Sequence, residues 1–317
     1  MSAMAALRSG VDLGGTNITV IVLPEGGEVS ASAKADTPRD GGPEDLVEAI
    51  AGAVREACGE AAALTGIGVG WPGAVDDATG MVAEAPNLAR MTEPFALAKE
   101  LERALGAPVR LGNDVSVATR AEFELGAGKE FDSLLGVYWG TGVGGGIIID
   151  GKLLEGRGAA GEFGHMVIRR RGAHCGCGNR GCVEAYAGRA QMEGWAARRH
   201  QDGKHTDLFS IAKRRGKERL TSSVWAHAYR DGDRVAIRAL ERAADALGAG
   251  IASAVNLLDL PAVVVGGGMG ERFWDSHGPR ITAAAHASLF QRERPPAILR
   301  SGLGDLGGAL GAALLVA

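Results

Sequence analysis

A pattern of strand, glycine turn and strand occurs twice in this chain, and the repetition restricts the folds that the sequence can adopt. Short apolar or alternating runs, typical of strands, flank each turn. Helical and strand patterns then alternate, which favours a duplicated α/β architecture with a ligand cleft between the halves. The predicted strands are Gly10–Leu13, Ile18–Leu23 and Val29–Ala35 in the first half, and Leu134–Trp139, Val143–Ile149 and Lys152–Leu154 in the second.

The elements that follow each hairpin complete the two predicted domains. In the first half we expect helices at Pro43–Cys58 and Phe95–Leu105, and strands at Ile67–Trp71 and Val109–Gly112. In the second half we expect a long helix at Val235–Leu257, strands at Leu260–Val265 and Ala297–Arg300, and a closing helix at Leu306–Val316. Residues 198–223 are polar and are expected to form helical excursions on the surface. We place the boundary near Asn113-Asp114, so that residues 1–113 with about 302–317 form a smaller domain and residues 114–301 a larger one.

Composition and charge exclude several classes of protein. Hydrophobic residues make up 46% of the chain and charged residues 23%, which is typical of a globular protein. No apolar run reaches the roughly 18 residues needed to cross a bilayer, and no signal-peptide pattern opens the chain. The net charge of −4 argues against a nucleic-acid surface, and the basic runs at 169–171 and 213–215 are interpreted as solvated. We therefore expect a cytoplasmic protein without a membrane or nucleic-acid partner.

Four potential metal ligands stand close together in the second half: His165, Cys175, Cys177 and Cys182. One imidazole and three thiolates suit a closed, tetrahedral and structural Zn²⁺ site, whereas disulfide bonding would leave His165 unexplained. Glu162 and Glu184 flank the ligands. A zinc-pinned loop can aim these two carboxylates at the hydroxyls of a polyol, and the second ring nitrogen of His165 is available for the same ligand.

The two glycine turns indicate phosphate binding. Asp12, Gly14, Gly15 and Thr16 form the first turn, and Gly140, Thr141 and Gly142 the second. Glycines let backbone N–H groups approach an anion, and Asp12 is a candidate Mg²⁺ ligand. Neither turn matches the Walker A pattern, and a plain hairpin turn is the alternative for each. A third glycine run, Gly266, Gly267 and Gly268, follows a predicted strand but is weak evidence alone.

Asn113-Asp114 follows a predicted strand and begins a helix. A carboxylate in this position can accept the proton of a hydroxyl that attacks phosphorus. The alternative is that these residues merely cap the helix.

Taken together, these motifs resemble the ROK family (repressors, open reading frames and sugar kinases). The resemblance runs nearly end to end, and its most specific part is the segment from Glu162 to Glu184 with its three cysteines. Its other elements are Asp12–Asn17, Pro72-Gly73, Pro86-Asn87, Asn113-Asp114, Gly140–Gly146 and Gly266–Gly268.

The resemblance implies a ribonuclease-H-like duplicated fold of the actin, hexokinase and Hsp70 type, with ATP and a sugar as ligands. By position, Asp114 is then the catalytic base. The implied sugar-binding residues are Gly73, Asn87, Asn113, Glu162, His165 and Glu184. Asp12, Gly14, Gly15, Thr16 and Gly140 to Gly142 are implied on the phosphate side of ATP, and Gly266 to Gly268 on the adenosine side. Asn17 departs from the Lys of many members, which puts the fine donor preference in doubt. A homodimer or homotetramer is also implied.

The leading functional hypothesis is a glucokinase that transfers the γ-phosphoryl group of ATP to the 6-hydroxyl of glucose. Other acceptors, N-acetylmannosamine, N-acetylglucosamine or another hexose, are left open, as is inorganic polyphosphate as donor. A sugar-binding regulator without catalysis is a rival, although only eleven residues precede Asp12 and no DNA-binding module fits there. An actin-like assembly protein would leave the metal cluster without a role.

Overall fold

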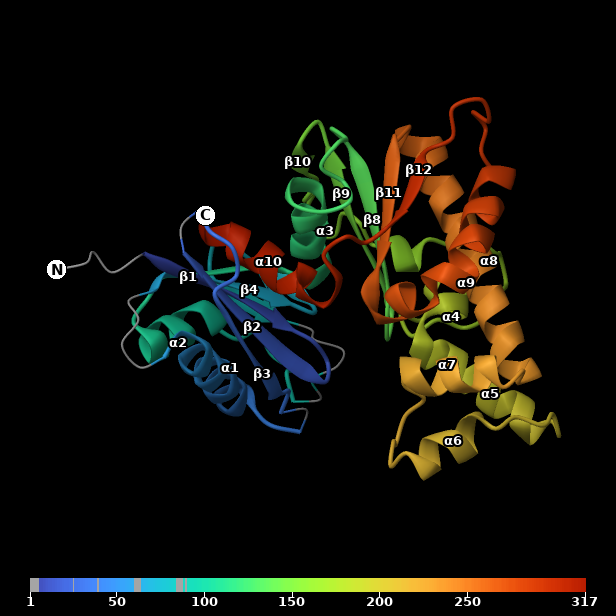
Figure 1. Cartoon of the computed structure of the whole chain (residues 1–317), viewed down its shortest axis with the longest axis horizontal. Helices are drawn as coiled ribbons and strands as arrows, with labels where there is room; N and C mark the ends of the chain where they lie inside the picture. The colour runs from blue at the N-terminus through green and yellow to red at the C-terminus, as the bar shows by residue number, and fades with distance from the viewer. Residues whose placement is uncertain (1–5, 25, 39, 60–63, 84–87, 89) are drawn as a thin grey trace. The chain divides into compact units, whose positions relative to one another are not determined.

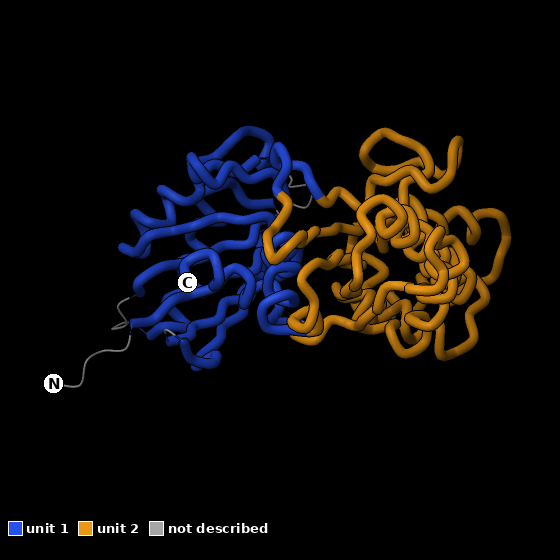
Figure 2. The backbone as a smooth tube through the Cα atoms, turned by 90° about the horizontal axis from the view of Figure 1, so that it is seen from above, with its two compact units in different colours: residues 1–126, 155–160, 305–317 blue, residues 127–154, 161–304 orange. Residues whose placement is uncertain are grey.

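The computed structural model of this chain describes residues 6–24, 26–38, 40–59, 64–83, 88 and 90–317. Contacts between residues divide it into two compact units, coloured separately in Figure 2. The first unit comprises residues 1–126, 155–160 and 305–317, and the second comprises residues 127–154 and 161–304. Asn87, one of the predicted sugar ligands, lies outside the described residues.

A five-stranded sheet in the order β3-β2-β1-β4-β7 forms the centre of the first unit (Figure 1). β2 pairs antiparallel with β1 and β3, whereas β4 runs parallel to both β1 and β7. A two-stranded ribbon of β5 and β6 follows β4 in the chain. The strands are β1 (Leu7–Leu13), β2 (Asn17–Pro24), β3 (Ala31–Asp36), β4 (Leu64–Trp71), β5 (Ala74–Asp76), β6 (Met81–Ala83) and β7 (Val109–Asn113).

Side chains of β2 point alternately to the two faces of the sheet, and their contacts show which helices cover each face. Val20 and Val22 belong to the core that also contains residues of α1 (Pro43–Cys58) and α2 (Leu97–Leu105). Ile21 points to the other face and clusters with Ala309 of α10 (Gly307–Ala313). Successive side chains of a strand face opposite sides, so both faces of this sheet are covered by helices. On the second face α3 (Asp114–Glu124) packs against α10.

The second unit repeats this sheet with the order β10-β9-β8-β11-β12. Its first three strands are antiparallel neighbours and its last three are parallel, as in the first unit. The duplicated α/β architecture predicted from the sequence is therefore confirmed. The strands are β8 (Leu134–Trp139), β9 (Val143–Ile149), β10 (Lys152–Leu153), β11 (Ala262–Gly266) and β12 (Ala297–Arg300).

Helices pack around the second sheet and enclose the larger core, which includes Trp139, Trp225 and Phe273. The longest helices, α8 and α9, lie side by side (Figure 1). α8 buries a continuous stripe that includes Leu240, Leu247 and Ile251, as its apolar spacing predicts. The helices are α4 (Glu184–Ala187), α5 (Arg189–Gln201), α6 (Leu208–Arg214), α7 (Ser222–Arg230), α8 (Arg234–Leu258) and α9 (Gly267–Ala287). Short 3-10 helices are η1 (Phe163–His165), η2 (Gly304–Leu306) and η3 (Leu314–Val316).

Besides shifts of one to three residues at the ends of other elements, three expectations differ from the structure. The helix expected from Phe95 begins at Leu97, because Phe95 forms an isolated β-bridge with Val82 instead. The closing helix divides into η2, α10 and η3. The compact units divide after Gly126 and not at Asn113-Asp114, because α3 packs on α10 within the first unit. Among the described helices, none is both long and apolar enough to cross a lipid bilayer.

Candidate active site and metal centre

The carboxyl ends of the parallel strands bring four predicted site residues of the first unit to one edge of its sheet. In the register of these strands Asp12 is opposite Gly70, and Trp71 is opposite Asn113. Gly73 and Asp114 follow directly from these strand ends. Asp12, Gly73, Asn113 and Asp114 therefore lie at the same edge of this sheet.

Asn113 and Asp114 have different tasks at the start of α3. The side chain of Asn113 is the helix cap: its Oδ1 accepts a hydrogen bond from the Ser116 amide at 3.1 Å. Its Nδ2 donates to the carbonyl oxygen of Gly73 at 3.4 Å. Asp114 is half-buried, and its Oδ1 accepts from the Val115 amide at 2.8 Å. Asn113 provides the side-chain cap, and Asp114 accepts a further amide of the first helical turn.

Gly70 is a site residue that the sequence reasoning missed. A Cβ at position 70 would lie 3.2 Å from Val117 Cγ2 and 3.5 Å from the Cα of Asp114, and Asp12 pairs with Gly70 across the sheet. A side chain at this position would press on the start of α3 next to Asp114. The glycine-rich alternation of Gly66, Gly68 and Gly70 along β4 was the available signal.

The first glycine turn connects β1 to β2. Gly14 donates its amide to the carbonyl oxygen of Asn17 at 2.9 Å, and Thr37 donates its hydroxyl to the carbonyl oxygen of Gly14 at 2.7 Å. Burial raises the pKa of Asp12 at the base of this turn to about 6. A bound cation stabilises the ionised form of such a poorly solvated carboxylate, so Asp12 is chemically suited to hold Mg²⁺.

The second glycine turn is held by two side chains of its own unit. Thr141 Oγ1 accepts a hydrogen bond from Arg189 Nη2 at 2.7 Å. The Val143 amide, just after the turn, donates to Glu184 Oε2 at 2.9 Å. A Cβ at position 142 would lie 2.4 Å from the same Glu184 oxygen, so a side chain there would displace the Glu184 carboxylate. The Arg189 contact was not foreseen, since nothing in the sequence pairs residues so far apart.

The third glycine run lies near the second turn on the same edge of the sheet. β11 ends at Gly266, which pairs with Tyr138 of β8, and α9 begins at Gly267. Gly267 has a φ of 81°, which favours glycine over any residue with a side chain. The predicted sequence of strand, glycines and helix is therefore confirmed. As at any helix start, the first backbone amides of α9 have no partner within the helix.

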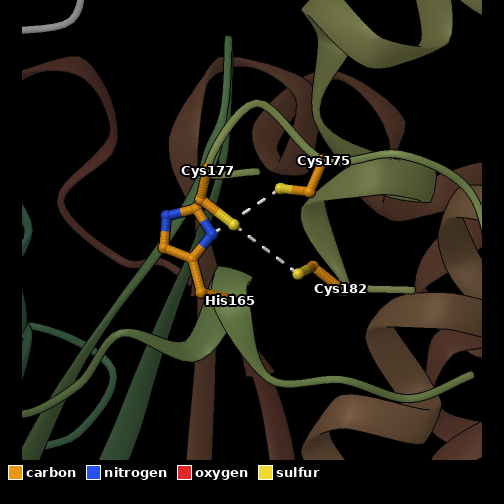
Figure 3. Close-up of side chains that lie close together, drawn as sticks. All are labelled: His165, Cys175, Cys177 and Cys182. Carbon is orange, nitrogen blue, oxygen red and sulfur yellow. Dashed lines mark hydrogen bonds between the residues drawn. The ribbon is translucent and has the colours of Figure 1, made fainter. Parts of the chain in front are cut away.

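His165, Cys175, Cys177 and Cys182 converge in the second unit, as Figure 3 shows. One potential ligand atom from each residue lies within 4.8 Å of all the others. Cys175 Sγ is 3.7 Å from His165 Nδ1, and Cys177 Sγ is 3.9 Å from Cys182 Sγ. A tetrahedral Zn²⁺ with ordinary bond lengths separates its ligand atoms by roughly 3.5–3.8 Å. The four side chains therefore fit a zinc ion with little movement.

The thiols of this cluster differ in their surroundings. Burial raises the pKa of the Cys175 thiol to about 12 and also raises that of Cys182, whereas the backbone amide of Asn179 lowers the pKa of the exposed Cys177. Without a cation nearby, the thiols of Cys175 and Cys182 are thus difficult to deprotonate. A bound metal cation supplies the positive charge that keeps buried thiolates ionised, which agrees with a metal-binding role.

The two predicted carboxylates lie on different sides of the cluster. Glu184 connects it to the second glycine turn: Oε1 accepts from Cys175 Sγ at 3.8 Å, while Oε2 accepts from the Val143 amide. Glu162 Oε2 is 3.9 Å from His165 Nε2, the ring nitrogen not used by the cluster, and both side chains are substantially exposed. η1 lies so close to β9 that a Cβ at position 164 would clash with the Val143 carbonyl oxygen. The absence of a side chain at Gly164 permits this approach.

Comparison with known proteins decides the family. The sequence model of the ROK family matches residues 8–317. This chain belongs to the ROK family. The match covers both units and every motif on which the resemblance was based.

Two sugar kinases and one solved structure illustrate the similarity. The glucokinase of Thermotoga maritima is 33% identical over 82% of this chain and 81% of its own. The N-acetyl-D-glucosamine kinase of Pasteurella multocida is 30% identical over 98% of this chain and 99% of its own. The ROK glucokinase of Streptomyces griseus, solved with glucose and AMPPNP, is 35% identical, with a TM-score of 0.82 over 98% of this chain and 99% of that one. The hexokinase-type fold expected for this ROK chain is confirmed.

Proposed function

We propose that this protein is a sugar kinase that transfers the γ-phosphoryl group of ATP to the 6-hydroxyl of a hexose, with glucose as the first candidate. The relatives named above are glucokinases and an N-acetyl-D-glucosamine kinase, which supports this chemistry. The observation that supports Asp114 as the base is the position of its half-buried carboxylate directly after β7, at the sheet edge where Asp12 also lies.

In this proposal Asp114 accepts the proton of the attacking 6-hydroxyl. Asn113, Gly73, Glu162, His165 and Glu184 bind and orient the sugar, since carboxylates and amides hydrogen-bond hydroxyl groups in fixed directions. Asn87, outside the described residues, completes the proposed sugar ligands.

The glycine turns serve the donor in this proposal. Backbone amides of the turns at 14–16 and 140–142, with the hydroxyls of Thr16 and Thr141, hydrogen-bond the phosphate groups, and Asp12 holds Mg²⁺. Mg²⁺ would neutralise charge on the phosphate groups, while the fixed amides stabilise the charge that builds up during transfer. Gly266 to Gly268 accommodate the adenosine.

The zinc ion would be structural. His165, Cys175, Cys177 and Cys182 would hold it, and it would fix the segment that carries Glu162 and Glu184. Because free thiols for a metal persist under reducing conditions, we place the protein in the cytoplasm. A homodimer or homotetramer is part of the same proposal.

A coupled assay of ADP release, with ATP as donor and about a dozen monosaccharides, tests the function, and an assay of sugar phosphate formation tests inorganic polyphosphate as donor. We expect ADP release with ATP and glucose. N-acetyl-D-glucosamine is the second candidate acceptor, because a kinase of that sugar is similar along almost the whole chain. Sugar-independent ATP hydrolysis, or no turnover with any hexose, would refute the proposal.

Asp114→Asn tests the assignment of the base. The amide keeps an oxygen for the Val115 N–H but cannot accept a proton, so we expect kcat to fall by roughly 10²–10⁴-fold with sugar affinity retained. The coupled assay measures kcat, and isothermal titration measures sugar binding. Asp275→Asn, whose side chain is 90% exposed, is the matched control. An Asp114→Asn enzyme with substantial kcat would remove Asp114 from the mechanism.

A further inference from the structure

A strongly basic pocket lies in the second unit, between the carboxyl end of α5 and the amino end of α8. It is open to solvent and has a volume of about 650 Å³. No acidic side chain lines it among the residues that the structure describes. Its basic lining residues are Arg199, Lys204, His205, Arg234, Arg238 and Arg242. In a chain with a net charge of −4, this concentration of positive charge is a local feature.

The backbone around this pocket is fixed by hydrogen bonds. α5 ends where Gly203 takes a φ of 78°, and the Lys204 amide donates to the Arg199 carbonyl oxygen at 2.9 Å. Asp233 caps α8 with one carboxylate oxygen, which accepts from the Val235 amide at 2.8 Å and the Ala236 amide at 2.9 Å. Its other oxygen accepts from Thr206 Oγ1 at 2.8 Å and from the Asp207 amide at 2.7 Å. The nearby Asp233 is thus fully occupied by backbone and loop donors.

Only some of the positive charges have an ionic partner. Arg199 is 3.7 Å from Asp202, and Arg238 is 3.3 Å from Glu241, in pairs whose arginines are exposed. Exposed pairs of this kind are weak and are easily exchanged for a better partner. Lys204, Arg234 and Arg242 have no carboxylate within 4.0 Å among the described residues.

Arg242 shows that the fold holds these charges close together. Its guanidinium lies 4.6 Å from the centre of the Trp195 ring and 5.6 Å from that of Tyr186, while Arg199 lies 5.4 Å from Trp195. Two guanidinium groups therefore contact one indole. Burial lowers the pKa of half-buried Arg242, and the positive charges of Arg199 and Arg238 lower it further.

We infer that this pocket binds a small anion that carries several negative charges on phosphate groups. Guanidinium groups present planar pairs of donors that match phosphate oxygens, and clustered arginines select for multivalent anions because each added charge gains a further partner. Two sources share this chemistry: a short inorganic phosphate chain and an organic phosphate ester. The pocket residues belong to α5, α8 and the loop after α5, and none of them is in the proposed sugar or ATP site.

Isothermal titration of the purified full chain with inorganic tripolyphosphate, at low ionic strength and without Mg²⁺, tests the inference. A parallel titration with a hexose 6-phosphate distinguishes the two sources by their relative affinities. We expect saturable binding of tripolyphosphate that weakens as salt is added. In the double variant Arg234→Glu/Arg238→Glu the affinity should fall at least tenfold.

Lys213→Glu is the matched control, because it reverses an exposed charge of the same unit that does not line the pocket. Circular dichroism establishes that each variant is folded, and Arg234→Gln/Arg238→Gln replaces the double reversal if that variant is not. Absence of tripolyphosphate binding, or equal affinity in wild type and pocket variant, would overturn the inference. A binding signal that is insensitive to the pocket residues would point to the proposed donor site instead. Because binding is measured directly, a failure of the kinase assay leaves this result intact.

Discussion

At the scale of single residues, Glu184 connects two parts of the site that are remote in sequence. One of its carboxylate oxygens accepts from Cys175 of the metal cluster, and the other accepts from Val143 beside the second glycine turn. A residue proposed to bind the sugar is therefore also a structural link within its unit. Two substitutions can separate these roles.

Glu184→Ala and Glu184→Gln form this pair. The alanine variant leaves the half-buried Val143 amide without its acceptor, so we expect the free energy of unfolding to fall by roughly 1–3 kcal/mol. The glutamine variant keeps an oxygen for that amide and should be closer to wild type in stability, while its sugar KM rises. Urea unfolding and the coupled kinase assay measure the two effects. Equal loss of stability in both variants would contradict this division.

His277 gives a pH dependence of stability. It is buried against the rings of Tyr229 and Phe273, and burial, with help from the positive charge of Arg280, lowers its pKa below the ordinary value of 6.5, while Glu241 opposes this shift. Below pH 6.5 the unfolded chain takes up a proton that the folded chain resists, so stability is lost as the pH falls. Above that pH this contribution is constant.

The midpoint of thermal unfolding, measured from pH 5 to 8, tests this expectation. The midpoint should fall more steeply below pH 6.5 in wild type than in His277→Gln, because only wild type carries the buried imidazole. His200→Gln, at an exposed position, should follow wild type. Parallel curves for wild type and His277→Gln would rule out this role of His277.

At the scale of elements, the segment from η1 to α4 has little regular secondary structure. Its backbone is connected by two isolated bridges, Val167 with Cys182 and His174 with Arg180, and by turn hydrogen bonds such as that from the Cys175 amide to the Asn179 carbonyl oxygen. A metal ion in the cluster would add a further constraint on this segment.

Cys177→Ala tests this expectation. We expect the zinc content to fall from about one ion per chain, the sugar KM to rise roughly tenfold or more, and the unfolding temperature to drop. Metal analysis, kinetics and thermal unfolding measure these quantities, and Cys58→Ala, on α1, is the control. A metal-free Cys177→Ala protein with unchanged stability and kinetics would show that the cluster is dispensable.

Local sequence patterns predicted those elements that depend on local forces. The bounds of α1, β8, β9 and β12 agree with the predicted ranges, because their apolar periods begin and end at glycine, proline or polar residues. The start of α2 was missed because a bridge between Phe95 and Val82 competes with the helix, and this bridge depends on tertiary structure.

The site could be predicted to a similar degree. The glycine turns and the cysteine cluster are contiguous patterns, so their residues were found in advance. The contact of Arg189 with Thr141 and the crowding at Gly70 arise from packing between segments that are distant in the chain. The basic pocket combines residues of α5 and α8 that no local pattern joins.

At the scale of the whole molecule, the last residues of the chain return to complete the first unit. α10 packs closely against β1 and β4, and this approach requires glycine: a Cβ at position 68 would lie 1.7 Å from the Ala312 carbonyl oxygen, and one at position 10 would lie 2.0 Å from that of Ala309. Residues 305–317 are thus part of the core of a unit whose strands are all built from residues 7–113.

Gly68→Ala should destabilise this unit. The methyl group forces α10 away from the sheet, so we expect the free energy of unfolding to fall by roughly 1–3 kcal/mol or more. Gly52→Ala on α1 is the control, because a Cβ there meets no atom within 4 Å and alanine should add about 0.5–1 kcal/mol of stability. Urea denaturation of both variants measures the difference. Equal midpoints would mean that α10 is not seated as described.

The return of α10 also sets an order of events while the chain is being made on the ribosome. Nascent domains generally fold as units, beginning with the one synthesised first. Here the first unit must wait for residues 305–317, whereas the second has all its residues once position 304 has emerged. The second unit, which is encoded later in the message, therefore has all its residues first. The strands of the first unit are without α10, which covers one face of their sheet, during most of translation.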